Sequence, residues 1–466
     1  MLQHGVGTGS ESIVVAGRVV DEAGGCWAAT APPEALRRYH RRDPAGLLAV
    51  GPTRASQSAA VRCSQPHSAA FRFTPSQPDT ADRTATWELP GMVHVALDGT
   101  PLLGQRTGIG RYTEHLLAAL AERADLTVSA TAFTLRGAGR LAALVPPGVA
   151  TRSFPMSARV LRSVWTRAEF PRVALFSGRC DVFHGTNFVL PPTGRAGGVV
   201  TIHDLGYLTM PDVVDDTSRR LRDLVPRSLR RAAAVCTPSQ AVADQVLQTY
   251  GGAVPEVVVT PLGVDPEWLA IEPPSELDRR RLNLPVDYFL FVGTREPRKD
   301  LTTLLSAYAQ FRSEWMSADT QRPEPPALVL VGPQGWGPDQ DPLPGVDVRG
   351  YAPTQLLRTV VAGARALVMP SRDEGFGLPA LEGLAAGVAV IVSNVPALVE
   401  VTAGHAEVFD VGDAADLATL LTAMADAAVD GSSADEARRR RREFAAGWTW
   451  GRCADRTCAA YRIAVG

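Results

Sequence analysis

The stretch ALVMPSRDEGFGLPALEGLAAGVAVIV, residues 366–392, decides the fold class of this chain. Its apolar ends, Ala366–Met369 and Val388–Val392, have the length and composition of short buried strands. Between them, Pro379 favours a helix start because proline tolerates the first helical turn, and Gly387 is placed to end that helix. A strand, a loop, a helix and a second strand make up the repeating unit of a doubly wound sheet. The stretch therefore predicts an α/β fold.

The loop before this predicted helix has the chemistry of a nucleotide-sugar site. Gly375 and Gly377 leave backbone N–H groups open to a ligand, and the helix N-terminus adds a positive dipole end that favours phosphate. Glu374 and Glu382 are carboxylates, which repel phosphate and instead accept hydrogen bonds from hydroxyl groups. We therefore predict the diphosphate on the glycines, the sugar on Glu374 and the ribose on Glu382. A tight turn with two solvated glutamates is the alternative interpretation.

The segment EGFGLPALE, residues 374–382, closely resembles the E-x7-E signature of retaining GT-B glycosyltransferases of family four, the mannosyltransferase-like transferases of group 1. The resemblance extends from about Met92 to the C-terminus. It implies a GT-B fold, in which two Rossmann-like doubly wound domains face each other across a cleft. It also implies that the C-terminal domain binds the donor, with Glu374 as a catalytic residue. The donor-binding residues implied here are Gly375, Phe376, Gly377, Leu378 and Glu382.

Changes in composition along the chain predict its domain organisation. Residues 1–91 are rich in Ala, Ser, Pro and Arg without sustained periodicity, so we expect a disordered extension, or a segment upstream of a natural start at Met92. The rest alternates between strand and helix patterns, interrupted by a proline-containing stretch that is typical of a linker. The segments predicted after the extension are a Rossmann-like acceptor domain (92–262), a linker (263–285), a Rossmann-like donor-binding domain (286–447) and a closing helix that returns to the N-terminal domain (448–466).

Composition and charge limit the possible classes of function. The chain has 466 residues with 45% hydrophobic and 21% charged side chains, which suits two or three globular domains. Its formal net charge of −2 argues against a nucleic-acid-binding protein. The six cysteines form no CxxC pair, which fits a reducing compartment without structural zinc. No apolar run reaches the ~20 residues of a membrane span and no secretory signal is evident, so we expect a cytoplasmic protein.

A second glycine-containing loop follows the first strand predicted in the N-terminal domain, Val93–Leu97. In the sequence GIGRYT, Gly108 and Gly110 precede a predicted helix, where they are expected to accept the donor diphosphate or let the sugar approach closely. The motif also resembles the corresponding loop of mannosyltransferase-like family members. This resemblance places Arg111 and Tyr112 at the acceptor, and a solvated first helical turn is the alternative.

Polar side chains follow another predicted strand of the N-terminal domain. The strand Val199–Ile202 leads directly into His203 and Asp204. Ligands of open α/β sheets bind beyond the carboxyl ends of the strands, so this pair is well placed for a site. The family resemblance implies that His203 is a catalytic residue near the transferred sugar and that Asp204 binds the acceptor. A histidine that only caps a turn is the alternative.

Three cations follow the strand Tyr288–Val292 in the sequence GTREPRKD, residues 293–300. Fixed cations stabilise the negative charge that a nucleoside diphosphate gains as the glycosidic bond breaks. The loop resembles the family's G-x-x-E-P-R-K-N element, with Asp300 in place of the usual asparagine at a predicted helix cap. A solvated basic loop is the alternative. The resemblance implies catalytic roles for Arg298 and Lys299, donor contacts for Gly293, Thr294 and Arg295, and either Arg295 or Arg298 as the phosphate-binding arginine.

Residues 151–179 bear on localisation, because they contain six arginines and a single acidic residue, Glu169. Apolar residues, including Val160, Val164 and Trp165, are interleaved with these arginines. A basic amphipathic segment of this kind can lie on an anionic membrane surface, which adds peripheral contact with the inner face of the plasma membrane as one interpretation. An ordinary surface helix whose apolar residues pack inward is the other.

Together these patterns predict a hexosyltransferase that uses a GDP- or UDP-linked sugar, with mannose favoured, and a glycan or glycolipid acceptor. Retention at the anomeric carbon is implied by the family resemblance alone. The loop cations and the helix dipole replace a metal, so neither a metal ion nor another cofactor is expected. The alternatives are another GT-B enzyme, such as a sugar-nucleotide epimerase or a glycogen-type synthase, and a non-catalytic nucleotide-sugar-binding scaffold.

Overall fold

The computed structural model describes residues 91–104, 108–135, 137–211, 216–318, 322–335, 343–427 and 431–466, and the backbone of two short strands near the N-terminus. These strands, β1 (Val14–Val15) and β2 (Arg18–Val19), pair antiparallel. The expectation of disorder over the rest of residues 1–90 lies outside the described residues. The chain divides into two compact units, residues 1–78 and 79–466, and all elements discussed below belong to the second unit.

The N-terminal half of this unit is built on a sheet of seven strands that all pair in parallel, in the order β5-β4-β3-β6-β7-β8-β9. The order reverses between β3 and β6, which is the topological switch point of a doubly wound sheet. The strands are β3 (Val93–Asp98), β4 (Leu126–Thr134), β5 (Ala150–Pro155), β6 (Val182–Gly185), β7 (Gly197–Thr201), β8 (Ala234–Thr237) and β9 (Glu256–Val259).

Helices of the N-terminal half cover this sheet and bury its apolar side chains. The helices are α1 (Gly108–Ala121), α2 (Ala158–Trp165), α3 (Ala174–Ser177), α4 (Gly206–Thr209), α5 (Asp216–Arg219), α6 (Leu221–Arg231) and α7 (Gln240–Tyr250). One core cluster contains Phe133, Trp165 and Phe183 together with Leu224 of α6. Burial of a side chain of this size contributes about 1.5–3 kcal/mol relative to exposure, so this cluster holds α2 and α6 against the sheet.

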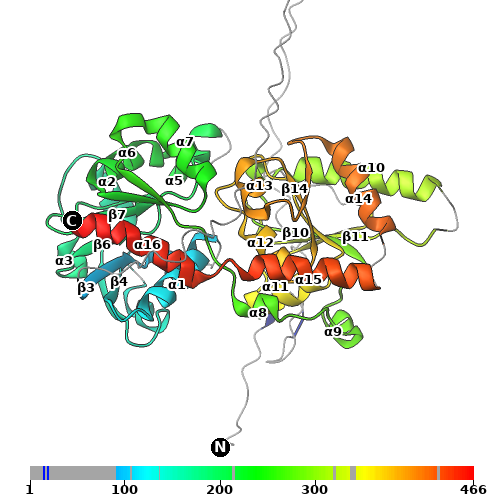
Figure 1. The fold of residues 1–466 in the computed structure, drawn as a ribbon, viewed down its shortest axis with the longest axis horizontal. Coiled ribbons are helices and arrows are strands. Elements are labelled where there is room, and N and C mark those ends of the chain that lie inside the picture. Colours follow the sequence, from blue (N-terminus) through cyan, green and yellow to red (C-terminus); the bar gives the residue numbers. More distant parts are fainter. Residues whose placement is uncertain are drawn as a thin grey trace, which may run out of the picture. The chain divides into compact units, whose positions relative to one another are not determined.

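The C-terminal half repeats the same design with six parallel strands in the order β12-β11-β10-β13-β14-β15. Its switch point lies between β10 and β13, and Figure 1 shows the two sheets as separate halves flanked by helices. The strands are β10 (Tyr288–Val292), β11 (Ala327–Val331), β12 (Val346–Arg349), β13 (Ala366–Met369), β14 (Ala389–Ser393) and β15 (Glu407–Phe409).

Helices of the C-terminal half pack on its sheet around Phe289, Phe311 and Trp315, and two short helices precede it in the chain. The two short helices are α8 (Pro266–Leu269) and α9 (Glu276–Arg281). The others are α10 (Leu301–Ala318), α11 (Thr354–Ala362), α12 (Leu378–Ala385), α13 (Pro396–Thr402), α14 (Ala414–Asp426) and α15 (Ser432–Ala446).

The last helix, α16 (Trp450–Val465), packs against α1 and strands β7 and β8 of the N-terminal half, as Figure 1 shows in red. Tyr461 of this helix lies 2.8 Å from His184 Nδ1, a buried hydrogen bond that ties it to β6. The chain crosses between the halves twice, after β9 and before α16, and the two crossing segments lie side by side. Val264 N donates to Trp448 O over 3.0 Å, and Trp450 Nε1 donates to Asp265 Oδ1 over 3.1 Å.

The predicted α/β fold class, with two doubly wound parallel sheets, is confirmed. The strand, loop, helix and strand expected between residues 366 and 392 form β13, α12 and β14. Two helix starts differ from the prediction. Helix α1 begins at Gly108, so Gly108 and Gly110 lie in its first turn and do not precede it, and α12 begins one residue before Pro379. Both shifts reflect the freedom of the first helical turn, whose N–H groups need no intrahelical partner.

Candidate active site

The two halves meet where the loop after β13 reaches the segment after β7. A side-chain carbon at position 375 would overlap the carbonyl oxygen of His203, so the backbones touch only because residue 375 is glycine. Ser239 Oγ donates a hydrogen bond to the Gly375 carbonyl over 2.7 Å and accepts one from Val242 N, which caps helix α7. The predicted donor loop therefore forms the boundary between the halves.

Glu374 lies at the centre of a polar network on this loop. Lys299 Nζ donates to its carboxylate, Ser371 Oγ donates over 2.8 Å, and Arg298 Nη1 lies 3.5 Å from it. Burial alone would raise the pKa of Glu374, but the charges of Lys299 and Arg298 and the two hydrogen bonds outweigh burial and hold this pKa below its usual value. Glu374 is 7% exposed, which excludes the solvated alternative for this residue.

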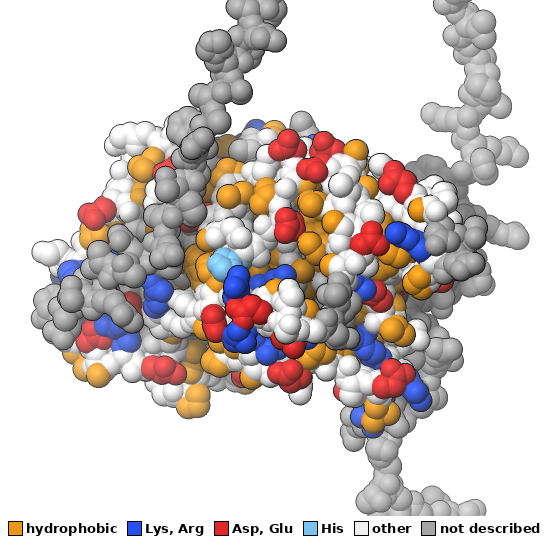
Figure 2. All heavy atoms as spheres, turned by 45° about the vertical axis from the view of Figure 1, so that its right-hand side comes forward, with side chains coloured by type: hydrophobic (Ala, Val, Ile, Leu, Met, Phe, Trp, Pro, Cys, Tyr) orange, Lys and Arg blue, Asp and Glu red, His pale blue; other side chains and the backbone are white. Residues whose placement is uncertain are grey.

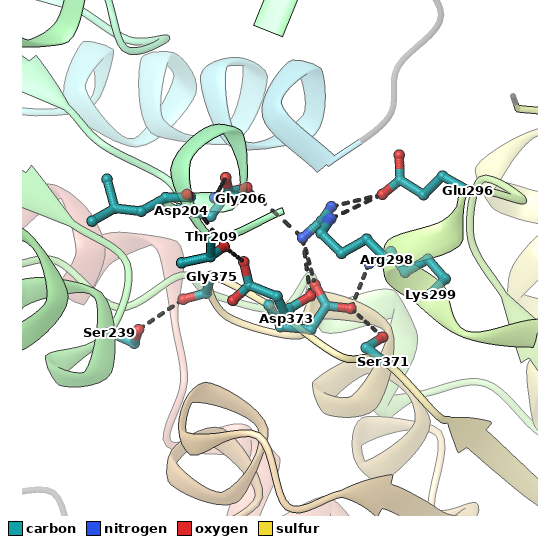
Figure 3. A network of polar contacts seen from close by, with 12 residues as sticks. Asp204, Gly206, Thr209, Ser239, Glu296, Arg298, Lys299, Ser371, Asp373 and Gly375 are labelled. Atoms are coloured by element: carbon teal, nitrogen blue, oxygen red, sulfur yellow. Dashed lines mark hydrogen bonds and ion pairs between the residues drawn. The ribbon is translucent and has the colours of Figure 1, made fainter. Parts of the chain in front are cut away.

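Arg298 carries a permanent charge within the same network, and Figure 3 shows its guanidinium directed at several carboxylates. Its Nε and Nη2 donate to Glu296 Oε1 over 3.1 and 2.8 Å, and its Nη1 donates to the Asp373 carbonyl over 3.2 Å. Asp204 of the N-terminal half lies 3.8 Å away. Burial alone would lower the pKa of Arg298, but these carboxylates raise it well above its usual value. The solvated-loop alternative does not describe this arginine.

Asp373 was missed by the sequence reasoning, although it stands directly before Glu374. Thr209 Oγ1 of α4 donates to Asp373 Oδ2 over 3.2 Å, so this side chain joins the loop after β13 to the N-terminal half (Figure 3). Burial and the nearby charge of Asp204 raise the pKa of the Asp373 carboxyl. The sequence did contain an indication of this role, because Asp373 follows the carboxyl end of β13 together with Ser371 and Glu374, and ligands bind at such strand ends.

Glu382 lies deep in α12 and forms an ion pair with Arg111 of α1, so two predicted site residues from different halves are joined. Glu382 is only 1% exposed, which excludes the solvated alternative here as well. Burial raises the pKa of the Glu382 carboxyl, and the Arg111 charge only partly opposes this. The carboxylate expected at the ribose is thus occupied by a guanidinium in this structure.

The rings of Tyr112 and His203 pack edge to face on the N-terminal half, with their centroids 4.9 Å apart. Tyr112 is 1% exposed and its hydroxyl lies 2.8 Å from Thr201 Oγ1, so it is neither in a solvated turn nor open to an acceptor. His203 Nε2 lies 2.8 Å from the Thr186 carbonyl oxygen, which can only accept, so this nitrogen carries the proton. Burial lowers the pKa of His203, which keeps the ring neutral with Nδ1 as its acceptor.

The remaining predicted donor residues lie after β10, at the start of α1 and between β13 and α12. Gly293 and Arg295 follow β10, and their backbones contact the loop after β11, where Gly293 N donates to Val331 O and Arg295 N donates to Pro333 O. Thr294 lies between them. Gly110 is buried in α1, whereas Gly108 is exposed at its start with no atom within 4 Å of an added side-chain carbon. Phe376 and Leu378 are buried, so their side chains are not open to a ligand.

Comparisons with known proteins agree with this architecture. The family model for glycosyl transferases group 1 matches residues 286–426, and the model for glycosyltransferase family 4 matches residues 106–268. The chain is 30% identical to the O-antigen chain mannosyltransferase B of Escherichia coli over 60% of this chain and 74% of the relative. It is 31% identical to D-inositol 3-phosphate glycosyltransferase 1 of Catenulispora acidiphila over 62% of this chain and 73% of the relative.

Solved structures show the same fold. Sucrose-phosphate synthase from Thermosynechococcus elongatus superposes with a TM-score of 0.59 at 20% identity, over 79% of this chain and 98% of that chain. The polar network around Glu374 lies at the carboxyl ends of the strands beside the switch point of the C-terminal sheet. Two family models and two relatives of about 30% identity thus cover both halves. The chain is a GT-B glycosyltransferase and belongs to glycosyltransferase family 4.

Proposed function

We propose that this protein transfers a hexosyl group, with mannose favoured, from a nucleoside diphosphate sugar to a glycan or glycolipid, with retention at the anomeric carbon. The observation that carries the proposal is the pairing of Arg298 and Lys299 with Glu374 at the carboxyl ends of β10 and β13. These strands flank the switch point, where open α/β sheets bind their ligands. The E. coli relative, named as a mannosyltransferase, supports the choice of sugar.

Arg298 and Lys299 are proposed to bind the donor diphosphate. Both cations are paired with carboxylates in this structure, and the phosphates of a donor would replace Glu374 and Asp204 as their partners. Asp204 belongs to the N-terminal half, so a movement of the halves apart would free Arg298 for the phosphate. As the glycosidic bond breaks, the leaving diphosphate gains charge and both cations stabilise it more strongly.

Glu374 is proposed to orient the sugar. The lowered pKa of this carboxyl keeps it ionised at neutral pH, where it accepts hydrogen bonds from sugar hydroxyls and has no proton to donate. Glu382 is proposed to bind the ribose hydroxyls after they displace Arg111. Backbone N–H groups at the start of α12 would donate to the phosphates, because the first N–H groups of a helix have no partner within the helix. Gly377 stands directly before this helix with a φ of 97°, a conformation that favours glycine.

The acceptor is proposed to approach from the N-terminal half, beside Asp204 and the neutral ring of His203. In the reaction, the bond from the anomeric carbon to the leaving phosphate breaks, and a bond to the acceptor oxygen forms on the same face. The acceptor proton passes to the leaving phosphate oxygen. No protein nucleophile and no metal takes part, so the fixed cations supply the charge stabilisation.

Turnover of a panel of UDP- and GDP-sugars by the full chain, in buffer with a chelator, tests this function. We expect one donor to be consumed slowly without acceptor, and Lys299→Ala and Glu374→Ala to abolish its consumption. Arg440→Ala is the matched control, because Arg440 lies on α15 and is 70% exposed. Release of a free altered sugar would identify an epimerase, and binding without turnover would identify a scaffold. Unchanged turnover in both site variants would refute the site.

A further inference from the structure

Helix α2 carries two apolar stripes, and only one of them packs on the protein. Leu161 and Trp165 are buried in the core of the N-terminal half. Val160 and Val164 lie one helical turn apart on another side of the helix and are 55% and 37% exposed. On α2 itself, the sequence-based alternative, in which the apolar residues pack inward, therefore describes Leu161 and Trp165 but not Val160 and Val164.

The exposed stripe lines a groove of about 550 Å³ between α2 and the start of α6. The groove, called the α2 groove below, is lined by Arg159, Val160, Ser163, Val164, Arg167, Ala168 and Arg220. Three of these seven residues are arginines and none is acidic. The surface thus combines aliphatic side chains with guanidinium groups that surround them. Arg220 stands directly before α6 and lies outside the arginine-rich segment 151–179.

Among the described residues, no acidic side chain forms an ion pair with an arginine of the α2 groove. Arg167 Nη1 donates to the Ser163 carbonyl over 3.2 Å, and Arg159 and Arg220 form no ion pair with any described residue. Glu169, the acid nearest in sequence, is held by Arg231 at 2.8 Å. On the face drawn in Figure 2, by contrast, acidic and basic side chains are interspersed.

We propose that the α2 groove docks this protein on a lipid bilayer that contains anionic phospholipid. The valines would enter the boundary between headgroups and acyl chains, while the arginines extend to the lipid phosphates. Because α2 has only eight residues, binding is expected to be reversible and to depend on lipid charge. This inference goes beyond the proposed transfer reaction and does not depend on it.

The docked surface belongs to the half that is proposed to present the acceptor. Arg222 of α6 donates from Nε to the Tyr207 carbonyl of α4 over 3.3 Å, and Thr209 of α4 contacts Asp373. Helix α6 therefore connects the α2 groove to the candidate active site. Docking through this groove would hold the acceptor side of the enzyme near the bilayer, where a lipid-linked acceptor resides.

Flotation of the full chain with vesicles tests the proposal without any turnover. Vesicles of phosphatidylcholine alone are compared with vesicles that also contain about one third phosphatidylglycerol. The first variant is Arg159→Gln with Arg220→Gln, and the second is Val160→Ser with Val164→Ser. The matched control is Arg439→Gln with Arg440→Gln, which removes the same charge from exposed positions of α15 that pair with Glu436. Thermal melting confirms that each variant folds.

We expect binding only to the anionic vesicles, and loss of that binding at ~1 M salt, where charges are screened within ~3 Å. The double arginine variant should partition about 30-fold more weakly, from roughly 1 kcal/mol per arginine at an anionic surface. The valine variant should also bind less, and the control should match the wild type. Equal binding to both vesicles, unchanged binding of the groove variants, or a self-association that only the valine variant loses would overturn the proposal.

Discussion

Arg111 and Glu382 form a buried ion pair that joins helix α1 of the N-terminal half to helix α12 of the C-terminal half. Their side chains are 13% and 2% exposed, so each charge is shielded from water and is stabilised by the opposite charge of its partner. The same carboxylate is proposed to bind the donor ribose. Contact between the halves and donor binding are therefore expected to compete for Glu382.

Removal of one member of this pair should destabilise the protein more than removal of both. Arg111→Ala leaves the Glu382 carboxylate buried without a partner, and we expect the free energy of unfolding to fall by about 3 kcal/mol. Arg111→Met combined with Glu382→Leu replaces the pair with apolar groups and should restore most of this loss. Urea denaturation at pH 7 measures both effects. A double variant no more stable than Arg111→Ala would contradict the pairing.

Gly375→Ala should prevent the halves from meeting, because the added methyl group would overlap the His203 carbonyl oxygen. A displacement of about 1 Å at a catalytic site can lower the rate about 100-fold, and we expect a loss of this size in kcat/KM for donor consumption. Gly350→Ala is the control, since no atom lies within 4 Å of the carbon it adds. Small-angle scattering should show a larger radius of gyration for Gly375→Ala only. Equal activity of the two variants would speak against contact at residue 375.

The stabilising contribution of Glu374 should disappear in acid. Its folded-state pKa is held below the unfolded value of about 4.3, so the ionised form stabilises the fold above that pH. The contribution is then lost as the pH falls through the folded-state pKa. The difference in free energy of unfolding between wild type and Glu374→Gln should be constant between about pH 6 and 8 and shrink below about pH 4. A difference that grows in acid would contradict the charge assignment.

Asp373 should show the opposite dependence on pH. Its folded-state pKa is raised by burial and by Asp204, so ionisation of Asp373 opposes folding as the pH rises above the unfolded pKa of about 3.9. Asp373→Asn keeps an acceptor for the Thr209 hydroxyl and removes the charge. We expect the variant to gain stability relative to wild type between about pH 3 and 7, measured by urea denaturation. An advantage that is independent of pH would argue against this interpretation.

Glu400 should stabilise helix α7 from the opposite half. Its carboxylate accepts hydrogen bonds from Gln240 N over 2.7 Å and from Ala241 N over 2.9 Å, which caps the helix start. Glu400→Ala should lower the free energy of unfolding by about 0.5–2 kcal/mol. Glu443→Ala, at an exposed position of α15, should change it by less than about 0.5 kcal/mol. Indistinguishable melting curves for the two variants would contradict the cap.

Local patterns in the sequence determined the elements and much of the candidate site. The apolar runs at Ala366–Met369 and Val388–Val392 predicted β13 and most of β14, because a buried parallel strand must be apolar on both faces. Arg298, Lys299 and Glu374 were predicted from short motifs, and the structure brings them together. Parallel strands end at one edge of a sheet, so residues that follow neighbouring strands meet whatever their separation along the chain.

Only the tertiary structure decided which side chains meet across the two halves. Arg111 and Glu382, Thr209 and Asp373, and Glu400 and the start of α7 are all separated by more than 150 residues. The burial of Tyr112 and the exposure of Val160 were likewise absent from the local pattern. Periodicity reports the faces of a single element, whereas these contacts depend on how one folded half docks on the other. That docking has no periodic signature in a single sequence.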